Sequence, residues 1–134
     1  MTVLYVDTSA LVKREVREDE SAAVESTLAE MTNMGVLIVA SALAWLEAWR
    51  ALQRRNFRDI GSRTESMFAG VEQFPLDEPV LRYARTVGGL QLRSLDAIHL
   101  ASAVMVGADS VMTYDDRLGE AVRSMGMTVL SPAE

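Results

Sequence analysis

Short apolar runs alternate with longer, mostly polar stretches along the whole chain. Residues 2–6 are apolar and β-branched and end abruptly at Asp7-Thr8-Ser9, the pattern of a buried strand followed by a helix cap. The runs VLIVAS at 36–41, SVMTY at 110–114 and MTVL at 127–130 predict three further strands. Because no Asn-Gly turn joins neighbouring runs, these strands are not expected to pair as hairpins.

The stretches between the strands have the composition of helices and carry residues typical of helix starts and stops. Gly35 and Gly107 are typical helix stops, and Pro79 fits a first helical turn. Ser41 and Ser94 each offer a cap to the helix that follows. The predicted helices cover 18–34, 42–56, much of 58–73, 79–87, 95–106 and 116–125, with a short extended link at 74–76.

Strands that alternate with helices predict an α/β fold with a mostly parallel central sheet. At 134 residues the chain can bury the core of one domain and is too short for two, so we expect a single domain over 1–134. No apolar run approaches the length of a membrane span, and no basic and apolar leader precedes Asp7. We therefore expect a cytoplasmic protein without a membrane segment.

Composition excludes several kinds of site, and charge bears on whether the chain binds nucleic acid. The chain has no cysteine, which excludes disulfides and cysteine-bound zinc, and its single histidine excludes a multi-histidine metal site. The net charge of -6 argues at first against nucleic acid, because proteins bind phosphate backbones with Lys and Arg. The segment 45–63 is nevertheless locally positive, with Arg50, Arg54, Arg55, Arg58 and Arg63 against only Glu47 and Asp59. Such a segment suits RNA phosphates or, alternatively, a solvated helix face that pairs with acids elsewhere.

Two acids follow directly on predicted strands. Asp7 comes after the first strand, and Asp115, with Asp116 beside it, comes after SVMTY. In open parallel sheets the functional crevice lies beyond the carboxyl ends of the strands, so these carboxylates are candidates for one site. Each of them taken alone also fits an ordinary turn residue or helix cap.

Two further acids lie on predicted helices. The segment SLDAIHLASAVMV is apolar nearly all round and predicts a buried helix, where an ionised Asp96 needs a partner, a hydrogen bond, a proton or a metal. Its place in the first helical turn also fits a cap. Glu47 shares a helix face with Arg50 and Arg54, and an i, i+3 ion pair with Arg50 is its alternative role.

The order and spacing of these acids resemble those of the PIN domain, specifically its VapC toxin branch, over essentially the whole chain. The segments that carry the resemblance are VDTSALV at 6–12, residues 41–50 with Glu47 and Arg50, SLDAIHLASA at 94–103 and TYDDRL at 113–118. The resemblance implies a three-layer α/β/α fold with about five short strands. It also implies a metal-dependent endoribonuclease that is the toxin of a toxin–antitoxin system, with a VapB-type antitoxin as partner and a toxin homodimer.

Carried over residue by residue, the resemblance implies a catalytic and metal-binding group of carboxylates with supporting and substrate-binding side chains around it. The carboxylates are Asp7, Glu47, Asp96 and Asp115, the supporting residues are Ser9, Thr113 and Asp116, and the substrate-binding residue is Arg50. Oxygen ligands without cysteine or a histidine cluster suit Mg²⁺ or Mn²⁺ and not zinc. Such an ion can activate water for attack on an RNA phosphodiester and stabilise charge on the phosphoryl oxygens.

Some individual assignments stay open at the level of the sequence. The family pattern requires one acid where this chain has two, and the motif register favours Asp115 over Asp116. His99 is either a general base or a residue that packs and supports the site. Trp45 and Trp49 face away from the helical acid and are expected in the core, with RNA stacking or a partner contact as alternatives.

The segment after the first strand is expected to contribute to binding. It interleaves apolar with basic side chains, Leu11, Val12 and Val16 with Lys13, Arg14 and Arg17. This pattern predicts a groove that a partner covers beside the first helix. The basic side chains are also expected to follow the RNA backbone.

Two other kinds of protein share a small acidic α/β domain. A phosphoacceptor receiver domain also has a Mg²⁺ pocket, but receivers carry an acidic pair after the first strand and a lysine near the last. Here the acidic pair is Asp115-Asp116 and the only lysine is Lys13. The alternative that remains is a catalytically inactive PIN-like domain that binds RNA or protein, against which the presence of all four acids argues.

Overall fold

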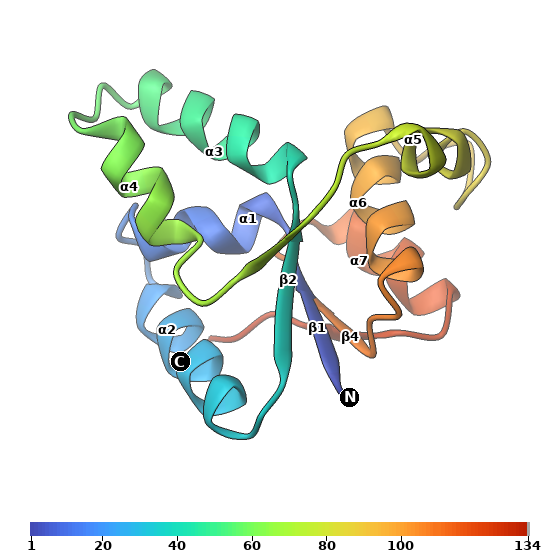
Figure 1. Ribbon diagram of the computed structural model, residues 1–134, viewed down its shortest axis with the longest axis horizontal. Coiled ribbons are helices and arrows are strands. Elements are labelled where there is room, and N and C mark those ends of the chain that lie inside the picture. Colours follow the sequence, from blue (N-terminus) through green and yellow to red (C-terminus); the bar gives the residue numbers. More distant parts are fainter. Residues whose placement is uncertain (134) are drawn as a thin grey trace.

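A parallel sheet of five strands runs through residues 1–133, the part of the chain that the computed structural model describes (Figure 1). The strands are β1 (Val3–Val6), β2 (Leu37–Ser41), β3 (Glu72–Phe74), β4 (Ser110–Met112) and β5 (Thr128–Leu130). Their order in the sheet is β3-β2-β1-β4-β5, and every neighbouring pair is parallel. The predicted α/β fold with a parallel sheet of short strands is confirmed.

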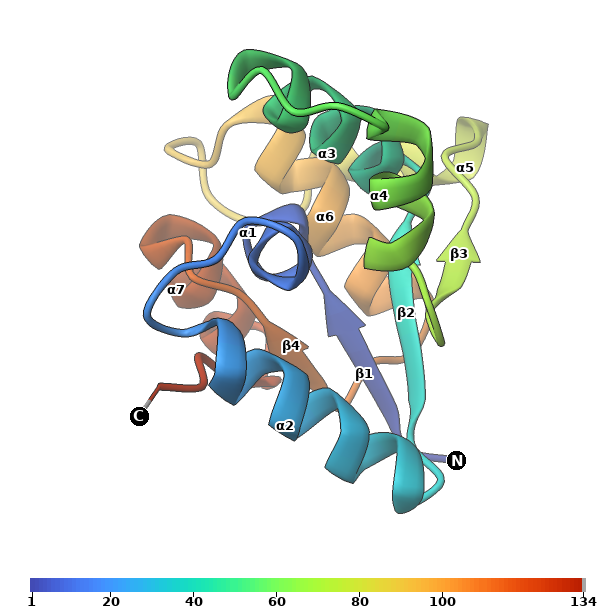
Figure 2. The same ribbon diagram turned by 90° about the vertical axis from the view of Figure 1, so that its left-hand side faces the viewer.

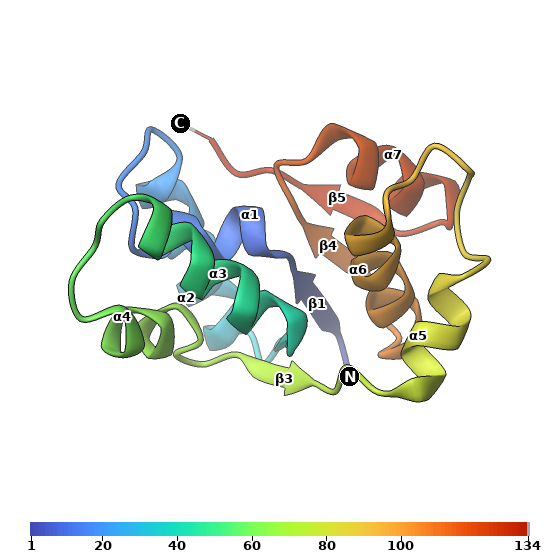
Figure 3. The same ribbon diagram turned by 90° about the horizontal axis from the view of Figure 1, so that it is seen from above.

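The helices form a layer on each side of this sheet. They are α1 (Thr8–Leu11), α2 (Ser21–Asn33), α3 (Leu43–Arg54), α4 (Ile60–Met67), α5 (Glu78–Ala84), α6 (Ser94–Met105) and α7 (Asp116–Ser124), with a 3₁₀ turn, η1, at Val12–Arg14. Figure 3 shows α1 to α4 on one side of the strands and α5 to α7 on the other, which completes the three layers. The predicted stops Gly35 and Gly107 follow α2 and α6 with φ angles of 82° and 75°, in the left-handed region that favours glycine.

The alternation of side chains along β1 explains why both faces of the sheet are covered. Leu4 and Val6 belong to the core under α1 to α4, whereas Tyr5 belongs to the core under α5 to α7. All three side chains are fully buried. A strand buried on both faces carries apolar residues throughout, which is the pattern of residues 2–6.

The carboxyl ends of the strands meet at one edge of the sheet. There β1 leads into α1, β4 leads toward α7, and β2 leads into α3, whose Leu43 amide donates to the Ser41 hydroxyl at 3.0 Å. Figure 2 shows α1, α3 and α6 grouped beyond the end of β1. This edge therefore brings together segments that are far apart in the sequence.

Differences from the predicted elements are local. The sequence predicts an extended link at 74–76, but Glu72–Phe74 pairs with β2 as an edge strand. Its first two residues are exposed, so it lacks the apolar run that marks the other strands. Ser94 is the first residue of α6 and not its cap, because Arg93 takes the capping position without a side-chain hydrogen bond. None of the helices within residues 1–133 is long and apolar enough to cross a membrane.

Candidate active site

Asp7 lies at the end of β1, where three donors hold its carboxylate. Its Oδ1 accepts from the Ser9 hydroxyl at 2.7 Å and from the Ala10 amide at 3.1 Å, and its Oδ2 accepts from the Thr113 hydroxyl at 2.5 Å. The side chain caps α1 and is only 3% exposed. Burial raises the pKa of Asp7, although the charge of His99 and the donated hydrogen bonds favour its ionised form.

The hydroxyls of Ser9 and Thr113 tie β1 to β4 around Asp7. Thr113 donates to Asp7 and accepts from the Asp115 amide at 3.0 Å. Ser9 donates to Asp7 and accepts from the Tyr114 amide at 2.9 Å. Each hydroxyl thus bridges the carboxylate and the backbone of the neighbouring strand end, which fixes the two acidic loops relative to each other.

Asp115 is the cap of α7, and Asp116 is the exposed first residue of that helix. Asp115 Oδ1 accepts from the Leu118 amide at 3.0 Å. The cap uses one carboxylate oxygen, and Oδ2 receives no protein donor among the hydrogen bonds of residues 1–133. Asp115 therefore acts as a helix cap, and a second oxygen remains for another ligand.

Glu47 reaches the same region from α3. Its Oε1 accepts from the Thr8 hydroxyl at 2.6 Å and meets the His99 Nε2 at 2.7 Å. In the described part of the chain its charge partner is His99 and not the exposed Arg50. Burial raises the pKa of Glu47, but the hydrogen bond and charge of His99 outweigh it and lower this pKa below its ordinary value.

His99 lies in α6 and is 4% exposed. Its Nδ1 meets the Tyr5 hydroxyl at 2.7 Å, on the side opposite to Glu47. Burial lowers the pKa of His99, but the hydrogen bond to Glu47 and the charge of Asp7 outweigh it and raise this pKa above its ordinary value. Both of its ring nitrogens are engaged and the side chain is buried, which argues against the general base considered from the sequence and favours a supporting role.

Asp96 is the acid without a structural partner. It lies half-buried in the first turn of α6, but it does not cap that helix and accepts no hydrogen bond from residues 1–133. Burial raises the pKa of Asp96, and the charges of Asp115, Asp7 and Glu47 raise it further against the opposing effect of His99. All four predicted carboxylates therefore lie close enough to interact electrostatically.

Asp96, Asp115 and Asp116 line one open hollow of about 390 Å³. Arg93 and Arg117 also line it, and neither forms an ion pair within residues 1–133. Neither arginine was predicted from the sequence as part of the site. Their spacing was the available signal, because Arg93 precedes Asp96 by three residues and Arg117 follows Asp115 by two.

Comparison with known proteins assigns this arrangement to a family. The family model described as PIN domain matches residues 4–123. The chain belongs to the PIN domain family. It is 39% identical over 137 aligned positions to the ribonuclease VapC46 of Mycobacterium tuberculosis, covering 99% of this chain and 100% of that protein, which places it in the VapC branch.

Solved structures of a toxin and of a toxin–antitoxin complex share the fold of this PIN domain. The sarcin-ricin-loop-cleaving toxin VapC20 of Mycobacterium tuberculosis superposes with a TM-score of 0.75 at 15% identity, covering 96% of this chain and 99% of that one. A toxin–antitoxin complex from Klebsiella pneumoniae contains a chain that matches with a TM-score of 0.68 at 14% identity, and 98% of each chain is covered. At such identities the likeness establishes the three-layer fold alone.

Asp96, Asp115 and Asp116 line the hollow of this PIN domain, but they do not form a complete set of metal ligands. Within residues 1–133, no three His, Asp or Glu side chains lie close enough together to hold an ion by themselves. Mg²⁺ keeps several waters and is usually bound through one or two carboxylates together with substrate phosphates. Asp96 and Asp115, which share the hollow and carry oxygens free of protein donors, therefore fit Mg²⁺ or Mn²⁺ in their donor chemistry.

Lys13 does not face the solvent. It is 8% exposed, and its Nζ lies 2.9 Å from Glu20, 3.4 Å from Glu18 and 4.6 Å from the centre of the Tyr114 ring. The prediction that Lys13 follows the RNA backbone is wrong. A sequence pattern shows a basic residue but not the acids that neutralise it from the next loop.

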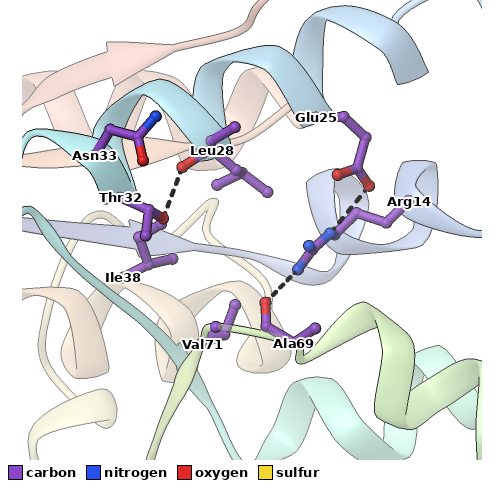
Figure 4. Close-up of a pocket in the computed structure, with 10 residues that line it drawn as sticks. Arg14, Glu25, Leu28, Thr32, Asn33, Ile38, Ala69 and Val71 are labelled. Atoms are coloured by element: carbon purple, nitrogen blue, oxygen red, sulfur yellow. Dashed lines mark hydrogen bonds and ion pairs between the residues drawn. The ribbon is translucent and has the colours of Figure 1, made fainter.

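The apolar residues from which a groove beside the first helix was predicted belong to the core or pack against it, so they do not form its surface; that a partner covers a groove there stays a prediction. Leu11 and Val12 are 0% and 8% exposed, and Val16 packs against the same cluster. Arg14 binds Glu25 at 3.1 Å and the Ala69 carbonyl at 2.9 Å, so it too is engaged and not free for RNA. Arg14 lines a hollow of about 320 Å³ between α2 and the turn after α4, and Figure 4 shows its contacts with Glu25 and Ala69 there.

Part of the arginine-rich segment packs against the protein. Trp45 packs against Phe68 with ring centres 5.1 Å apart and contacts the core under α1 to α4, as predicted, while Trp49 is half-buried. Arg63 pairs with Glu15 at 3.4 Å. The positive charge that this segment can offer to RNA is therefore smaller than its composition indicates, because Glu15 neutralises Arg63.

Proposed function

We propose that this PIN domain is a metal-dependent endoribonuclease and the toxin component of a toxin–antitoxin system. The observation that carries the proposal is Asp96, a half-buried carboxylate without a hydrogen-bond donor in residues 1–133, whose pKa is raised by burial and by three other acids. Such an arrangement costs folding free energy unless a cation compensates it. The ribonuclease and toxin names of its relatives support RNA as the substrate.

Within this proposal, each acid has a distinct task. Asp96 and Asp115 would hold Mg²⁺ or Mn²⁺ in the hollow, Glu47 would contribute its second oxygen directly or through water, and Asp7 would anchor both strand ends. When bound, the ion supplies Lewis acidity, so that a water is activated for attack on the phosphodiester and charge on the phosphoryl oxygens is stabilised. Asp116 stands at the rim of the hollow, where it supports the local negative potential.

The experiment that tests the proposal is RNA cleavage by the purified chain, followed with and without a divalent cation. A domain that only binds RNA or protein, the alternative function, leaves RNA intact under every condition. The positions of new RNA 5′ ends would then identify the cleavage site.

Substrate binding is proposed to involve arginines around the hollow. Arg50 is exposed on α3, one turn after Glu47, and Arg93 and Arg117 line the hollow itself. Arginine suits phosphate because its planar fork can bind two oxygens at once. These side chains supply the positive charge that the buried Lys13 does not.

Replacing Arg93 and Arg117 together by Gln is expected to weaken RNA binding about tenfold or more and to reduce the salt dependence of binding by about one per arginine. Fluorescence anisotropy of a labelled RNA at several salt concentrations measures both quantities. Arg123→Gln, which removes an exposed arginine of α7 outside the hollow, is the matched control. An unchanged salt slope in the double variant, or an equal loss in the control, would show that these arginines do not contact RNA.

The proposed partner is a VapB-type antitoxin, and the proposed toxin assembly is a homodimer. A toxin–antitoxin complex among the structures that share this fold supports the antitoxin. The proposal includes location in the cytoplasm, where both the RNA and the antitoxin are made.

A further inference from the structure

A buried chain of hydrogen bonds leads from the interior of the sheet to Glu47. The Tyr5 hydroxyl meets His99 Nδ1 at 2.7 Å, His99 Nε2 meets Glu47 Oε1 at 2.7 Å, and the Thr8 hydroxyl donates to the same oxygen at 2.6 Å. These four residues belong to β1, α6, α3 and α1. Two donors from α1 and α6 therefore meet on one carboxylate oxygen of α3, and Tyr5 of β1 supports one of them from behind.

The contacts determine which nitrogen of His99 carries a proton. An ionised Glu47 can only accept hydrogen bonds, so Nε2 must be the protonated nitrogen of a neutral His99. The Tyr5 hydroxyl then donates to Nδ1, and it can accept from Nδ1 when the ring is charged. The Nε2–H bond to Glu47 is present in either case.

Both donors to Glu47 bind the same oxygen. Thr8 and His99 share Oε1, and Oε2 receives no donor among the hydrogen bonds of residues 1–133. Two donors from different helices fix the rotation of the carboxylate as well as its position. One oxygen is thus anchored, and the other stays available to an external ligand.

We propose that His99 is a positioning residue, which acts with Tyr5 and Thr8 to hold Glu47 in the orientation that presents Oε2 to a divalent cation or to its water. The proposal rests on the function proposed above and adds a specific task to the only histidine of the chain. A purely structural ion pair is a weaker explanation, because a buried pair contributes little net stability compared with apolar packing. The arrangement matches the general pattern in which partners behind a metal ligand fix its orientation.

The protonated nitrogen can be identified directly. Because His99 is the only histidine, ¹⁵N-histidine labelling gives the NMR signals of this ring alone. We expect Nε2 to carry a slowly exchanging proton in the metal-free protein, and we expect Tyr5→Phe to speed this exchange. A ring protonated on Nδ1 with a bare Nε2 would overturn the proposal.

Replacing His99 by Gln or by Asn distinguishes a role in positioning Glu47 from a role in packing alone. The side-chain nitrogen of Gln can replace Nε2 toward Glu47, whereas that of Asn can replace only Nδ1 toward Tyr5. Mn²⁺ affinity, measured by calorimetry without RNA, should fall about tenfold or more in His99→Asn and stay within about threefold of the parent in His99→Gln. Thermal melts of both metal-free variants serve as the control for folding.

The outcomes distinguish this inference from the proposed function. Equal Mn²⁺ affinities of His99→Asn, His99→Gln and the parent, with RNA cleavage intact, would overturn the positioning role and leave the function standing. If the parent binds Mn²⁺ and the affinities of the variants follow the expected order, but the parent cleaves no RNA, the positioning role would stand and the proposed function would be overturned. If either variant does not fold, Tyr5→Phe provides the same comparison, with a severalfold loss of Mn²⁺ affinity expected and an unchanged affinity counting against the proposal.

Discussion

Asp96→Asn is expected to abolish RNA cleavage while leaving the metal-free protein at least as stable as the parent. Asp96 caps no helix and accepts no hydrogen bond in residues 1–133, so the substitution removes a charge and little else. The repulsion from Asp115, Asp7 and Glu47 that raises the pKa of Asp96 disappears with that charge. Cleavage should fall by more than about 100-fold, since removing an ion ligand costs more than the about 10–100-fold loss typical of a residue that supports one.

The gain in stability from Asp96→Asn is expected to depend on pH, and the raised pKa of Asp96 determines the direction of that dependence. Because the pKa of Asp96 is raised in the folded protein, the folded state favours the protonated form of Asp96 more than the unfolded chain does. The stability that this provides is complete below the ordinary Asp pKa of about 4 and is lost as the pH rises through the raised value. The gain in melting temperature from Asp96→Asn should therefore be small at about pH 4 and larger at about pH 7.

Thermal melts with and without Mg²⁺, beside a cleavage assay, test this prediction. Mg²⁺ should stabilise the parent by binding its native state, and Asp96→Asn should lose most of that stabilisation. Asp116→Asn, an exposed acid on the rim of the same hollow, is the matched control and should change stability little. Retained cleavage with an unchanged response to Mg²⁺ would contradict the assignment of Asp96.

Asp7→Ala is expected to abolish cleavage and to destabilise the fold at the same time. The substitution leaves the Ser9 hydroxyl, the Ala10 amide and the Thr113 hydroxyl without their acceptor. Each unpaired buried donor costs about 1–3 kcal/mol, partly compensated by the removal of a buried charge, so we expect a loss of about 2–4 kcal/mol in the free energy of unfolding. Activity and stability thus fall together at Asp7 and move apart at Asp96.

Urea unfolding of the metal-free protein measures this loss. Asp115→Ala is the comparison, because it removes one cap hydrogen bond at a half-buried position and should cost about 1 kcal/mol. If Asp7→Ala were as stable as the parent, the hydrogen bonds around Asp7 would not hold the two strand ends together.

The sequence predicted the sheet and the acids at its edge for a simple physical reason. Parallel strands place their carboxyl ends on one side, so Asp7 and Asp115 had to lie near each other once β1 and β4 were neighbours. Asp96 also followed from local pattern, because an acid in an otherwise apolar helix is conspicuous. The place of each acid at a strand end or in a helix thus follows from a local signal, whereas the closeness of Asp7 and Asp115 also needs the pairing of β1 with β4.

The pairings of charged side chains could not be predicted in the same way. The bond between Glu47 and His99 joins positions 52 residues apart, and the sequence instead offered Arg50 as the partner. Likewise Lys13 looked available for RNA, although Glu18 and Glu20 neutralise it. Which acid forms an ion pair with which base depends on how separate helices pack against each other. The pattern of residues within one segment contains no information about that packing.

The central claim is that the carboxylates at this sheet edge use a divalent cation to cut RNA, and cleavage by the purified chain in defined metal tests it most directly. A labelled RNA is incubated with Mg²⁺, with Mn²⁺ and with excess chelator, and Asp96→Asn purified in parallel reports any contaminating nuclease. We predict cleavage with either ion, none with the chelator, and none by the variant. Undiminished cleavage in excess chelator, or equal cleavage by Asp96→Asn, would contradict the account.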